Sequence, residues 1–420
     1  MLKQLRSRKK SHWTSYLQIK KYGLITLFVC LISGCVSTDR PYSPQEPMRE
    51  KQILQDNQFG VDGLGGARVA ELTPDGTQLL VTSADDNSLA IFNVASDFQL
   101  TFNRVFINNS TVDGLNGATS LVLSPDGRRA YVVSFYDSAL VIFEQDEQGN
   151  YQFLQAIRDG LPYEEVFSED ELVKLKDKLG LLGAYDIAIT NDNRQLFVAS
   201  VVSNAISIFD INESGNVFFN HAIRDNDNSE YGLGGAVNVI LTPNNSKVIV
   251  AGFNENAITI FNRNTNGVLD HSQTLTNGKD GVKNMISPQG LAMSPNGSYL
   301  YVACGGGNSI IVFARNDQNR YSYIQSISNS DDVFGLGGAG YVTTSPDGTR
   351  VYVASESDNA VVTLAKLSDG SLKIISVLKS EGVKKTDELN GAASVYVSPD
   401  GKHLLVTTGK GDTLIVYSIH

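Results

Sequence analysis

Cysteine is scarce in this chain of 420 residues, which contains only three. Cys30 and Cys35 lie close to the N-terminus, so Cys304 is the one cysteine in the rest of the chain. A single thiol cannot form a disulfide framework. Because residues 301–304 form a short apolar run, we expect Cys304 to be a buried, inert thiol rather than a nucleophile.

Basic residues are few once the N-terminal segment is set aside. Seven of the 34 lysines and arginines fall in the first 34 residues, which contain no acidic residue. The remainder has 27 basic against 45 acidic residues, a net charge of −18. So acidic a surface repels phosphate backbones and anionic lipid, which argues against nucleic acid as a partner.

Long apolar runs are also missing. The apolar run at 22–32 has 11 residues, whereas a membrane span needs about 20. A basic segment followed by a short apolar run is typical of a signal peptide. The run ends in Ile32-Ser33-Gly34-Cys35, which resembles the lipobox of bacterial lipoproteins.

The lipobox resemblance implies that residues 1–34 are a signal peptide and that Cys35 carries the lipid. Residues 35–50 would then be a tether, and residues 51–420 the folded domain. Val36 stands where lipoproteins retained at the inner membrane usually have aspartate, which implies an outer-membrane location in a Gram-negative host. An ordinary signal peptide with an incidental cysteine is the alternative.

Lipidation of Cys35 predicts that metabolic labelling with palmitate marks the protein. Each buried methylene contributes about 0.8 kcal/mol to membrane binding, so two or three acyl chains give lasting attachment. The Cys35→Ser variant is expected to carry no label and to leave the membrane fraction. Label on that variant would contradict the lipoprotein assignment.

One unit recurs seven times in the rest of the chain. Most units contain the motif Gly-Leu-Xaa-Gly-Ala, at 63–67, 114–118, 180–184, 232–236 and 335–339. The seventh keeps part of it at 389–392, and the fifth has Ser287-Pro288-Gln289-Gly290 instead. A turn follows each motif, at Pro74, Pro125, Asn191, Pro243, Pro295, Pro346 and Pro399. A fixed period of this kind is the signature of a repeat architecture.

Each unit has the pattern of four short strands. In the second unit, 118–123 alternates small and apolar residues, and 124–127 is a Ser-Pro-Asp-Gly turn. Strands rich in β-branched and aromatic residues follow at 131–134, 140–143 and 151–157. Four antiparallel strands in about 50 residues are typical of a propeller blade. The sequence therefore predicts an all-β, seven-bladed β-propeller.

The last unit ends after three strands, at the C-terminus. Residues 51–59 precede the first motif in the way that each fourth strand precedes the next one. We therefore expect this N-terminal strand to complete the last blade and close the ring, which pairs two strand edges that would otherwise be exposed.

One interval between turns is about 15 residues longer than the others, and the extra residues fall at 158–180. Residues 168–171 match a helix capping box, and leucines recur at helical spacing after it. We expect a short amphipathic helix there that packs on the adjacent blade, with a functional lid as the alternative.

The loops before each first strand and the turns between second and third strands lie on one face of a propeller. Loop-lined mouths of this kind are the usual binding sites. The candidate ligand-binding residues at this mouth are Asp62, Arg68, Asp85, Asp86, Asp113, Asp137, Tyr185 and Asp358. The Asp-Asn and Gly-Asn pairs in these turns also suit hairpins for backbone reasons alone.

A ring of Asp62, Asp85, Asp113 and Asp137 could also hold a hard cation such as Ca²⁺, although no loop has the dense spacing of a calcium site. We expect no metal and no cofactor. Histidine offers little chemistry, since His221 and His271 fall in outer strands and His403 follows a turn on the opposite face. No zinc, Ser-His-Asp, Cys-His or phosphate-loop pattern is present.

The blades repeat a sequence pattern that runs from Ser-Pro-Asp-Gly through Tyr-Val and Asp-Asn-Ala to Val/Ile-Phe. This pattern resembles that of the lactonase-like, YVTN-type seven-bladed propellers over residues 50–420. It differs from WD40 repeats, since the one tryptophan, Trp13, lies in the signal peptide. The resemblance implies two kinds of function. Some members open or form sugar and muconate lactones, with Arg, His and Glu at the channel mouth. Others are envelope proteins that bind partners.

Because no histidine is expected at the mouth, the sequence favours a lipid-anchored, monomeric binding platform for a protein or glycan partner. The alternative is a lactonase-like hydrolase of a small sugar-derived lactone. A redox or metal enzyme is a third, weaker hypothesis, because its ligands are missing.

Overall fold

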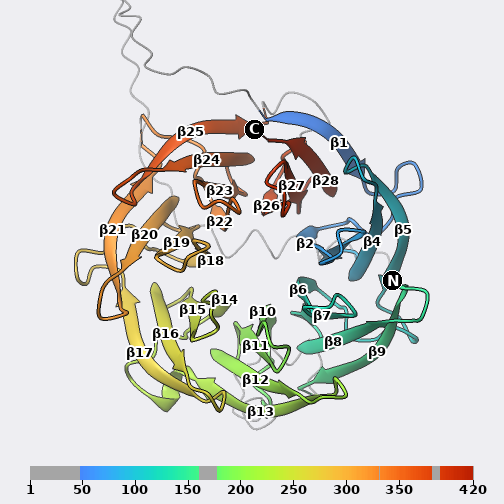
Figure 1. Ribbon diagram of the computed structural model, residues 1–420, viewed down its shortest axis with the longest axis horizontal. Helices are drawn as coiled ribbons and strands as arrows, with labels where there is room; N and C mark the ends of the chain where they lie inside the picture. Colours follow the sequence, from blue (N-terminus) through green and yellow to red (C-terminus); the bar gives the residue numbers. More distant parts are fainter. Residues whose placement is uncertain (1–47, 160–176, 331, 381–387, 420) are drawn as a thin grey trace, which may run out of the picture. The chain divides into compact units, whose positions relative to one another are not determined.

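The computed structural model describes residues 48–159, 177–330, 332–380 and 388–419. In these residues 28 strands form seven four-stranded antiparallel sheets, arranged around a central axis (Figure 1). One short 3-10 helix, Asp225–Asp227, is the only helix in the same residues. The prediction of an all-β, seven-bladed propeller is confirmed.

Within each sheet the first strand lies nearest the axis and the fourth lies outermost. The first sheet contains β2 (Ala67–Leu72), β3 (Gln78–Ser83), β4 (Ser88–Val94) and β5 (Leu100–Ile107). The second contains β6 (Ala118–Leu123), β7 (Arg129–Ser134), β8 (Ala139–Gln145) and β9 (Tyr151–Arg158). The third contains β10 (Ala184–Ile189), β11 (Gln195–Ser200), β12 (Ala205–Ile211) and β13 (Val217–Arg224). The fourth contains β14 (Ala236–Leu241), β15 (Lys247–Gly252), β16 (Ala257–Arg263) and β17 (Leu269–Thr276).

The remaining three sheets repeat this order. The fifth contains β18 (Pro288–Met293), β19 (Tyr299–Cys304), β20 (Ser309–Arg315) and β21 (Tyr321–Ser328). The sixth contains β22 (Ala339–Thr344), β23 (Arg350–Ser355), β24 (Ala360–Lys366) and β25 (Leu372–Lys379). The seventh contains β26 (Ala392–Val397), β27 (His403–Thr408), β28 (Thr413–Ser418) and β1 (Arg49–Gln55).

The seventh sheet takes its fourth strand from the N-terminal side of the domain. β1 pairs antiparallel with β28, from Arg49 opposite Ser418 to Gln55 opposite Thr413. This strand begins two residues before the expected domain boundary at residue 51. The predicted signal peptide, most of the tether and most of the 158–180 insertion lie outside the described residues. Within those residues, the structure contains no helix with the length and hydrophobicity of a membrane span.

The hydrophobic core lies between adjacent sheets. Second and third strands are buried on both faces, as the pattern of β11 (Gln195–Ser200) shows, and they bring aliphatic and aromatic side chains to both neighbouring sheets. One cluster joins Phe143 and Val132 of the second sheet to Leu80 and Ile91 of the first. Burial of this kind is the main favourable contribution to folding, at about 25 cal/mol per Å² of apolar surface.

A repeated hydrogen bond links each blade to the next one on the face that carries the turns between second and third strands. The side-chain oxygen of a turn residue accepts the backbone N–H that precedes the next first strand, at 2.6–3.3 Å. In the described residues the acceptors are Asn87, Ser138, Asn204, Asn256, Asn308, Asn359 and Asp412. All seven have a positive φ, which asparagine tolerates better than most residues. Asp412 bonds to Gly66 and so links the last blade to the first.

Replacing one such acceptor is expected to weaken the joint between two blades. Asn204 has φ of 49° and accepts the N–H of Gly235 at 2.6 Å. Asn204→Gly removes the hydrogen bond but keeps the backbone relaxed, so we expect a loss of about 1 kcal/mol in the free energy of unfolding. Asn204→Ala adds left-handed strain and is expected to lose about 1 kcal/mol more. Equal losses for the two variants in chemical denaturation would contradict this account.

Candidate active site

The seven first strands line the central channel, and each contains a β-bulge near its start. In four of these strands the first paired residue after the bulge is polar and lines the channel cavity. These residues are Ser120, Asp186, Asn238 and Tyr341. Bulges redirect side chains and are over-represented at active sites. The sequence did not reveal these bulges, because each adds one residue to a strand whose length looks ordinary.

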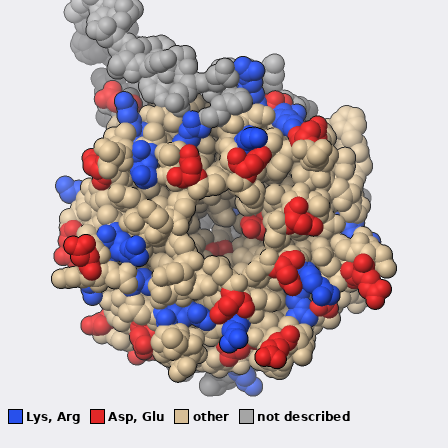
Figure 2. Space-filling model, in the orientation of Figure 1, with Lys and Arg blue, Asp and Glu red and all other residues tan. Residues whose placement is uncertain are grey.

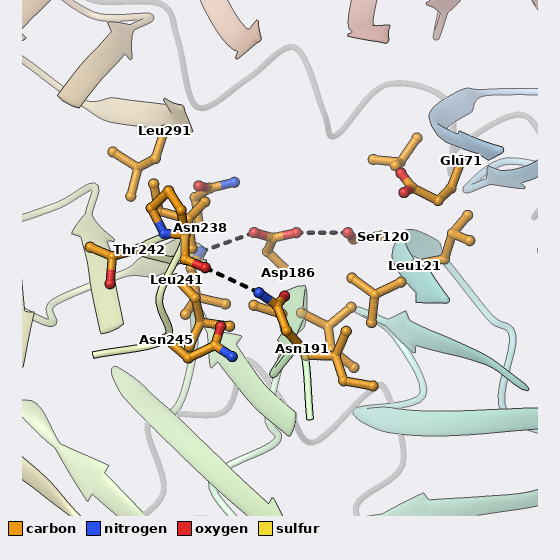
Figure 3. Close-up of a pocket in the computed structure, with 18 of the residues that line it drawn as sticks. Glu71, Ser120, Leu121, Asp186, Asn191, Asn238, Leu241, Thr242, Asn245 and Leu291 are labelled. Carbon is orange, nitrogen blue, oxygen red and sulfur yellow. Dashed lines mark hydrogen bonds between the residues drawn. The ribbon is translucent and has the colours of Figure 1, made fainter. Parts of the chain in front are cut away.

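The channel contains a cavity of about 320 Å³ that is lined by residues of six of the seven first strands. Figure 2 shows the channel as a hollow at the centre of the ring, with acidic atoms visible inside it. In the close-up, Asp186 of β10 and Glu71 of β2 both point into this space (Figure 3). Turns between first and second strands also contribute to the lining, through Asn191, Thr242 and Asn245.

Asp186 is held between two neighbouring blades. Its Oδ1 accepts the hydroxyl of Ser120 at 2.6 Å, and its Oδ2 accepts the N–H of Val239 at 2.9 Å. Burial raises the pKa of Asp186 to about 6, while these hydrogen bonds favour the charged form and limit the increase. The group is therefore largely a carboxylate at neutral pH, in a fixed orientation.

Glu71 reaches the channel from β2, and its charge affects the pKa values of two nearby phenols. Burial raises the pKa of Glu71 to about 7, so about half of the population is protonated at neutral pH. Burial raises the pKa of the Tyr341 phenol, and the charges of Asp186 and Glu71 raise it further. The same causes act on Tyr396 of β26, whose charged neighbours are Glu71 and Tyr341. Both phenols remain hydrogen-bond donors at neutral pH.

The aspartates predicted at the mouth mostly support the loops. Asp86, Asp137 and Asp358 each accept a backbone N–H from the loop before the first strand of their own blade, at 2.7, 2.9 and 2.8 Å. Asp113 forms an ion pair with Arg158, which also lies 3.7 Å from Asp137. These contacts explain why acidic residues recur in the turns, and the explanation does not require a bound ligand.

The other predicted residues lie apart from the cavity as well. Tyr185 packs edge-to-face on Phe135 with ring centroids 6.3 Å apart, and Asp85 is exposed. Arg68 is the second residue of β2 and contacts the blade of Thr407, whose hydroxyl donates to the Arg68 carbonyl at 2.5 Å. Asp62 approaches Asp56 and Asp86. None of the eight predicted residues belongs to the described cavity lining, and their role in binding stays a prediction.

The four aspartates predicted as a possible cation ring do not form one group, and Asp85 is exposed and belongs to neither of the two groups that contain the others. Asp113 and Asp137 lie beside Arg158, which balances their charge. Asp62 instead groups with Asp56 and Asp86, and one carboxylate oxygen from each lies within 4.8 Å of the others. Burial and the charges of its neighbours raise the pKa of Asp86.

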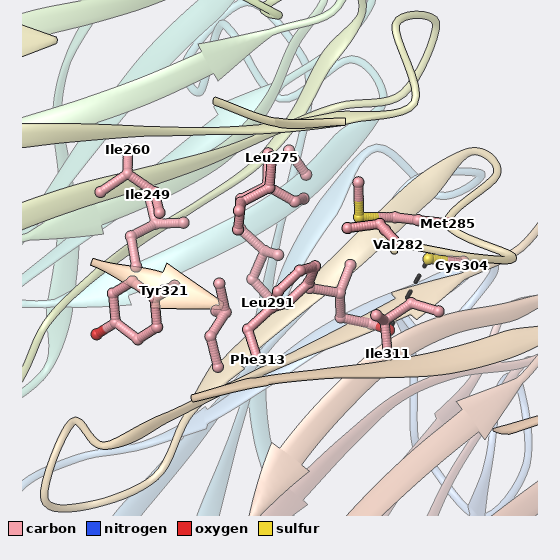
Figure 4. Close-up of a cluster of buried hydrophobic side chains, with 14 of the residues drawn as sticks. Ile249, Ile260, Leu275, Val282, Met285, Leu291, Cys304, Ile311, Phe313 and Tyr321 are labelled. Atoms are coloured by element: carbon pink, nitrogen blue, oxygen red, sulfur yellow. Dashed lines mark hydrogen bonds between the residues drawn. The ribbon is translucent and has the colours of Figure 1, made fainter. Parts of the chain in front are cut away.

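Cys304 lies among apolar side chains and is not part of the cavity lining. It is fully buried in a cluster with Met285, Ile311 and Val282, between the fourth and fifth sheets (Figure 4). Burial raises the pKa of its thiol, so the nucleophilic thiolate is not accessible near neutral pH. The prediction that this thiol is buried is confirmed, and its raised pKa agrees with the expected lack of reactivity.

The chain matches the family model described as lactonase, 7-bladed beta-propeller, over residues 33–271 and 335–420. It belongs to this family. A 6-phosphogluconolactonase from Klebsiella pneumoniae (strain 342) is 28% identical over 158 residues, which are 37% of this chain and 43% of that relative. The match thus spans less than half the length of the relative.

Solved structures share the fold at lower identity. A Bacteroides fragilis protein, named as a candidate 6-phosphogluconolactonase, has a TM-score of 0.62 at 16% identity and covers 83% of this chain and 93% of its own. A Bacteroides uniformis protein named in the same way has a TM-score of 0.60 at 19% identity, with 79% and 88% covered. At such identities the likeness shows the fold alone.

These comparisons contradict the interpretation of the chain as a non-catalytic binding platform and favour the lactonase-like alternative. That interpretation depended on the lack of histidine at one face of the propeller. It overlooked acidic and phenolic residues inside the first strands, since one polar residue in a short apolar strand is not conspicuous. The signal that could have found them is the carboxyl residue at positions 71 and 186, each on a strand expected to be buried.

Proposed function

We propose that this protein is a lactonase-like hydrolase and that the reaction takes place in the central cavity. The observation that carries the proposal is the pair of carboxyl groups, Asp186 and Glu71, which point into one cavity (Figure 3) that Tyr341 also lines. Paired carboxyl groups with different environments can divide the roles of base and acid. The family match and the named relative support the same reaction class.

The proposed reaction adds one water molecule across the ring ester. Asp186, as a carboxylate, takes a proton from a water molecule, and the water oxygen attacks the carbonyl carbon of the lactone. The tetrahedral anion collapses when the bond between the carbonyl carbon and the ring oxygen breaks. The ring oxygen leaves with a proton from Glu71, which gives the open hydroxy acid. Transfer of the proton from Asp186 to Glu71 through solvent restores both groups.

The phenol of Tyr341 has a separate role in this proposal. It remains protonated at neutral pH because its pKa is raised, so it can donate a hydrogen bond to the carbonyl oxygen as negative charge develops there. Donors that are oriented toward such an oxygen in a water-poor site typically contribute about 10²–10³-fold in rate.

The test is a direct assay of lactone hydrolysis by the purified protein, followed as acid release in a pH-stat with the spontaneous rate subtracted. Gluconolactone, its 6-phosphate and the unsubstituted δ-valerolactone cover the range of sizes and charges. Saturable hydrolysis of at least one of them supports the proposal. No rate above the spontaneous one for any lactone across pH 5–8 would overturn it.

Glu71→Gln is expected to change both the pH profile and the stability. Glutamine cannot give up a proton, so we expect kcat to fall and the decrease of activity above about pH 7 to disappear, since this decrease reflects ionisation of Glu71. Native Glu71 binds its proton up to about pH 7, whereas an unfolded glutamate releases it near pH 4.3. Stability of the wild type should therefore decrease as the pH rises between these values.

The variant lacks this decrease, because glutamine stays neutral. We expect Glu71→Gln to be more stable than the wild type at pH 8, by up to about 3 kcal/mol, and to match it at pH 4. Unfolding by guanidinium at both pH values measures the difference. A variant that is equally stable at pH 8 would show that Glu71 is not desolvated in the native protein.

A further inference from the structure

Asn238 carries an unpaired polar atom in the cavity wall. The residue is 9% exposed, lies at the bulge of β14 and lines the cavity beside Asp186 (Figure 3). Its Oδ1 has no hydrogen-bond partner in the part of the chain that the structure describes. Buried amide groups are nearly always hydrogen-bonded, so an unpaired one needs an explanation. A ligand that supplies a donor at this point would satisfy it.

The charge of the cavity limits what such a ligand can be. Two carboxyl groups line it, and none of the described lining residues is a lysine, arginine or histidine. Recognition of a phosphate group usually requires arginine or lysine, or a set of oriented backbone N–H groups. Here the lining offers carboxylates, hydroxyls and amides, which suit the hydroxyl groups of a neutral sugar.

We propose that the cavity selects an uncharged, polyhydroxylated lactone over its phosphorylated counterpart, and that Asn238 binds a ring hydroxyl of that substrate. The inference rests on the proposed function, since it names the substrate class of the same cavity. It separates this chain from the activity in the name of its Klebsiella relative, whose substrate carries a phosphate. Asn238 acts here as a specificity-determining residue, because it neither transfers a proton nor attacks the carbonyl.

The first experiment compares kcat/KM for gluconolactone and 6-phosphogluconolactone at pH 7 and at two ionic strengths. We expect at least a tenfold preference for the neutral lactone, and a smaller preference at high salt, because salt screens the repulsion of the phosphate. Equal or better hydrolysis of the phosphorylated lactone would overturn the inference and leave the proposed function intact. Failure to hydrolyse any lactone would instead overturn the proposed function.

The second experiment uses Asn238→Leu, which keeps a similar shape and removes the unpaired amide. We expect KM for gluconolactone to rise at least tenfold, while kcat/KM for δ-valerolactone, which has no hydroxyl groups, changes less than threefold. The melting temperature should stay level or rise, because removing an unsatisfied buried group without changing the shape is neutral or stabilising. Asn220→Ala on the outer strand β13 is the matched control, and it should leave KM and kcat/KM unchanged for both lactones.

Two outcomes would contradict the role of Asn238. An equal decrease in kcat/KM for gluconolactone and δ-valerolactone would indicate that Asn238 has a purely structural role. An unchanged KM for gluconolactone would show that no hydroxyl binds there. If the leucine variant fails to fold, Asn238→Ser keeps a smaller polar group and should show the same order of effects, with a smaller increase in KM.

Discussion

Asp186→Asn is expected to lower kcat/KM for lactone hydrolysis by about 10²–10⁴-fold, the range typical of a lost general base. Asparagine has nearly the same shape, and it can accept the N–H of Val239 with its oxygen and donate its Nδ2–H to the Ser120 hydroxyl, the two groups that Asp186 contacts at 2.9 and 2.6 Å. It cannot take a proton from water. The loss should therefore appear in kcat, with KM nearly unchanged, because the chemical step and not binding is affected.

The pH profile gives an independent check on Asp186. The wild type should gain activity as the pH rises through about 6, since Asp186 must be ionised to act as a base. Asp186→Asn should lose this increase together with the rate. Asp270→Asn on the outer strand β17, where the aspartate is exposed, is the matched control and should keep the wild-type profile. A fully active Asp186→Asn variant would remove the carboxylate pair from the mechanism.

Deleting residues 50–59 is expected to destabilise the whole ring by about 5 kcal/mol or more. The deletion removes most of β1, which pairs with β28 at six positions, and each backbone hydrogen bond contributes about 1 kcal/mol. It also removes Gln52, whose side chain exchanges two hydrogen bonds with the backbone of Leu100 in the first blade. Two blades therefore lose contacts at once.

Calorimetry should show one cooperative transition at a lower temperature, because every blade depends on both neighbours for its buried faces. Gln58→Ala, in the exposed loop after β1, is the control and should unfold like the wild type. An unchanged melting temperature after the deletion would show that β1 contributes little to the ring. A separate early transition for the last blade alone would contradict cooperative closure.

The repeat could be predicted from the sequence because each blade needs the same backbone geometry in its turns. Positive φ at Asn87 and Asn359 follows from the hairpin between second and third strands, and asparagine is one of the few residues suited to it. The glycines at 66 and 391 occupy a left-handed position as well, with φ of 68° and 67°. Local geometry of this kind leaves a visible mark at every period.

The functional residues left no such mark. Glu71, Ser120, Asp186, Asn238 and Tyr341 occur once each, on five different first strands. Four of them, Ser120, Asp186, Asn238 and Tyr341, occupy the same position of their strands, but the residue type at this position changes from blade to blade and is Gly290 in the fifth blade. A repeat pattern therefore hides these residues, because it records what the blades share and not where they differ.

By itself, the sequence determined the number of blades, the order of strands and the turn residues, since these depend on contacts within about 50 residues and between neighbouring units. Only the tertiary structure decided which residues meet in the channel. Closing the ring brings Glu71 and Asp186 into one cavity although 115 positions separate them. The bulges and the burial of the first strands then direct their side chains inward and raise their pKa values, and neither effect is local to the sequence.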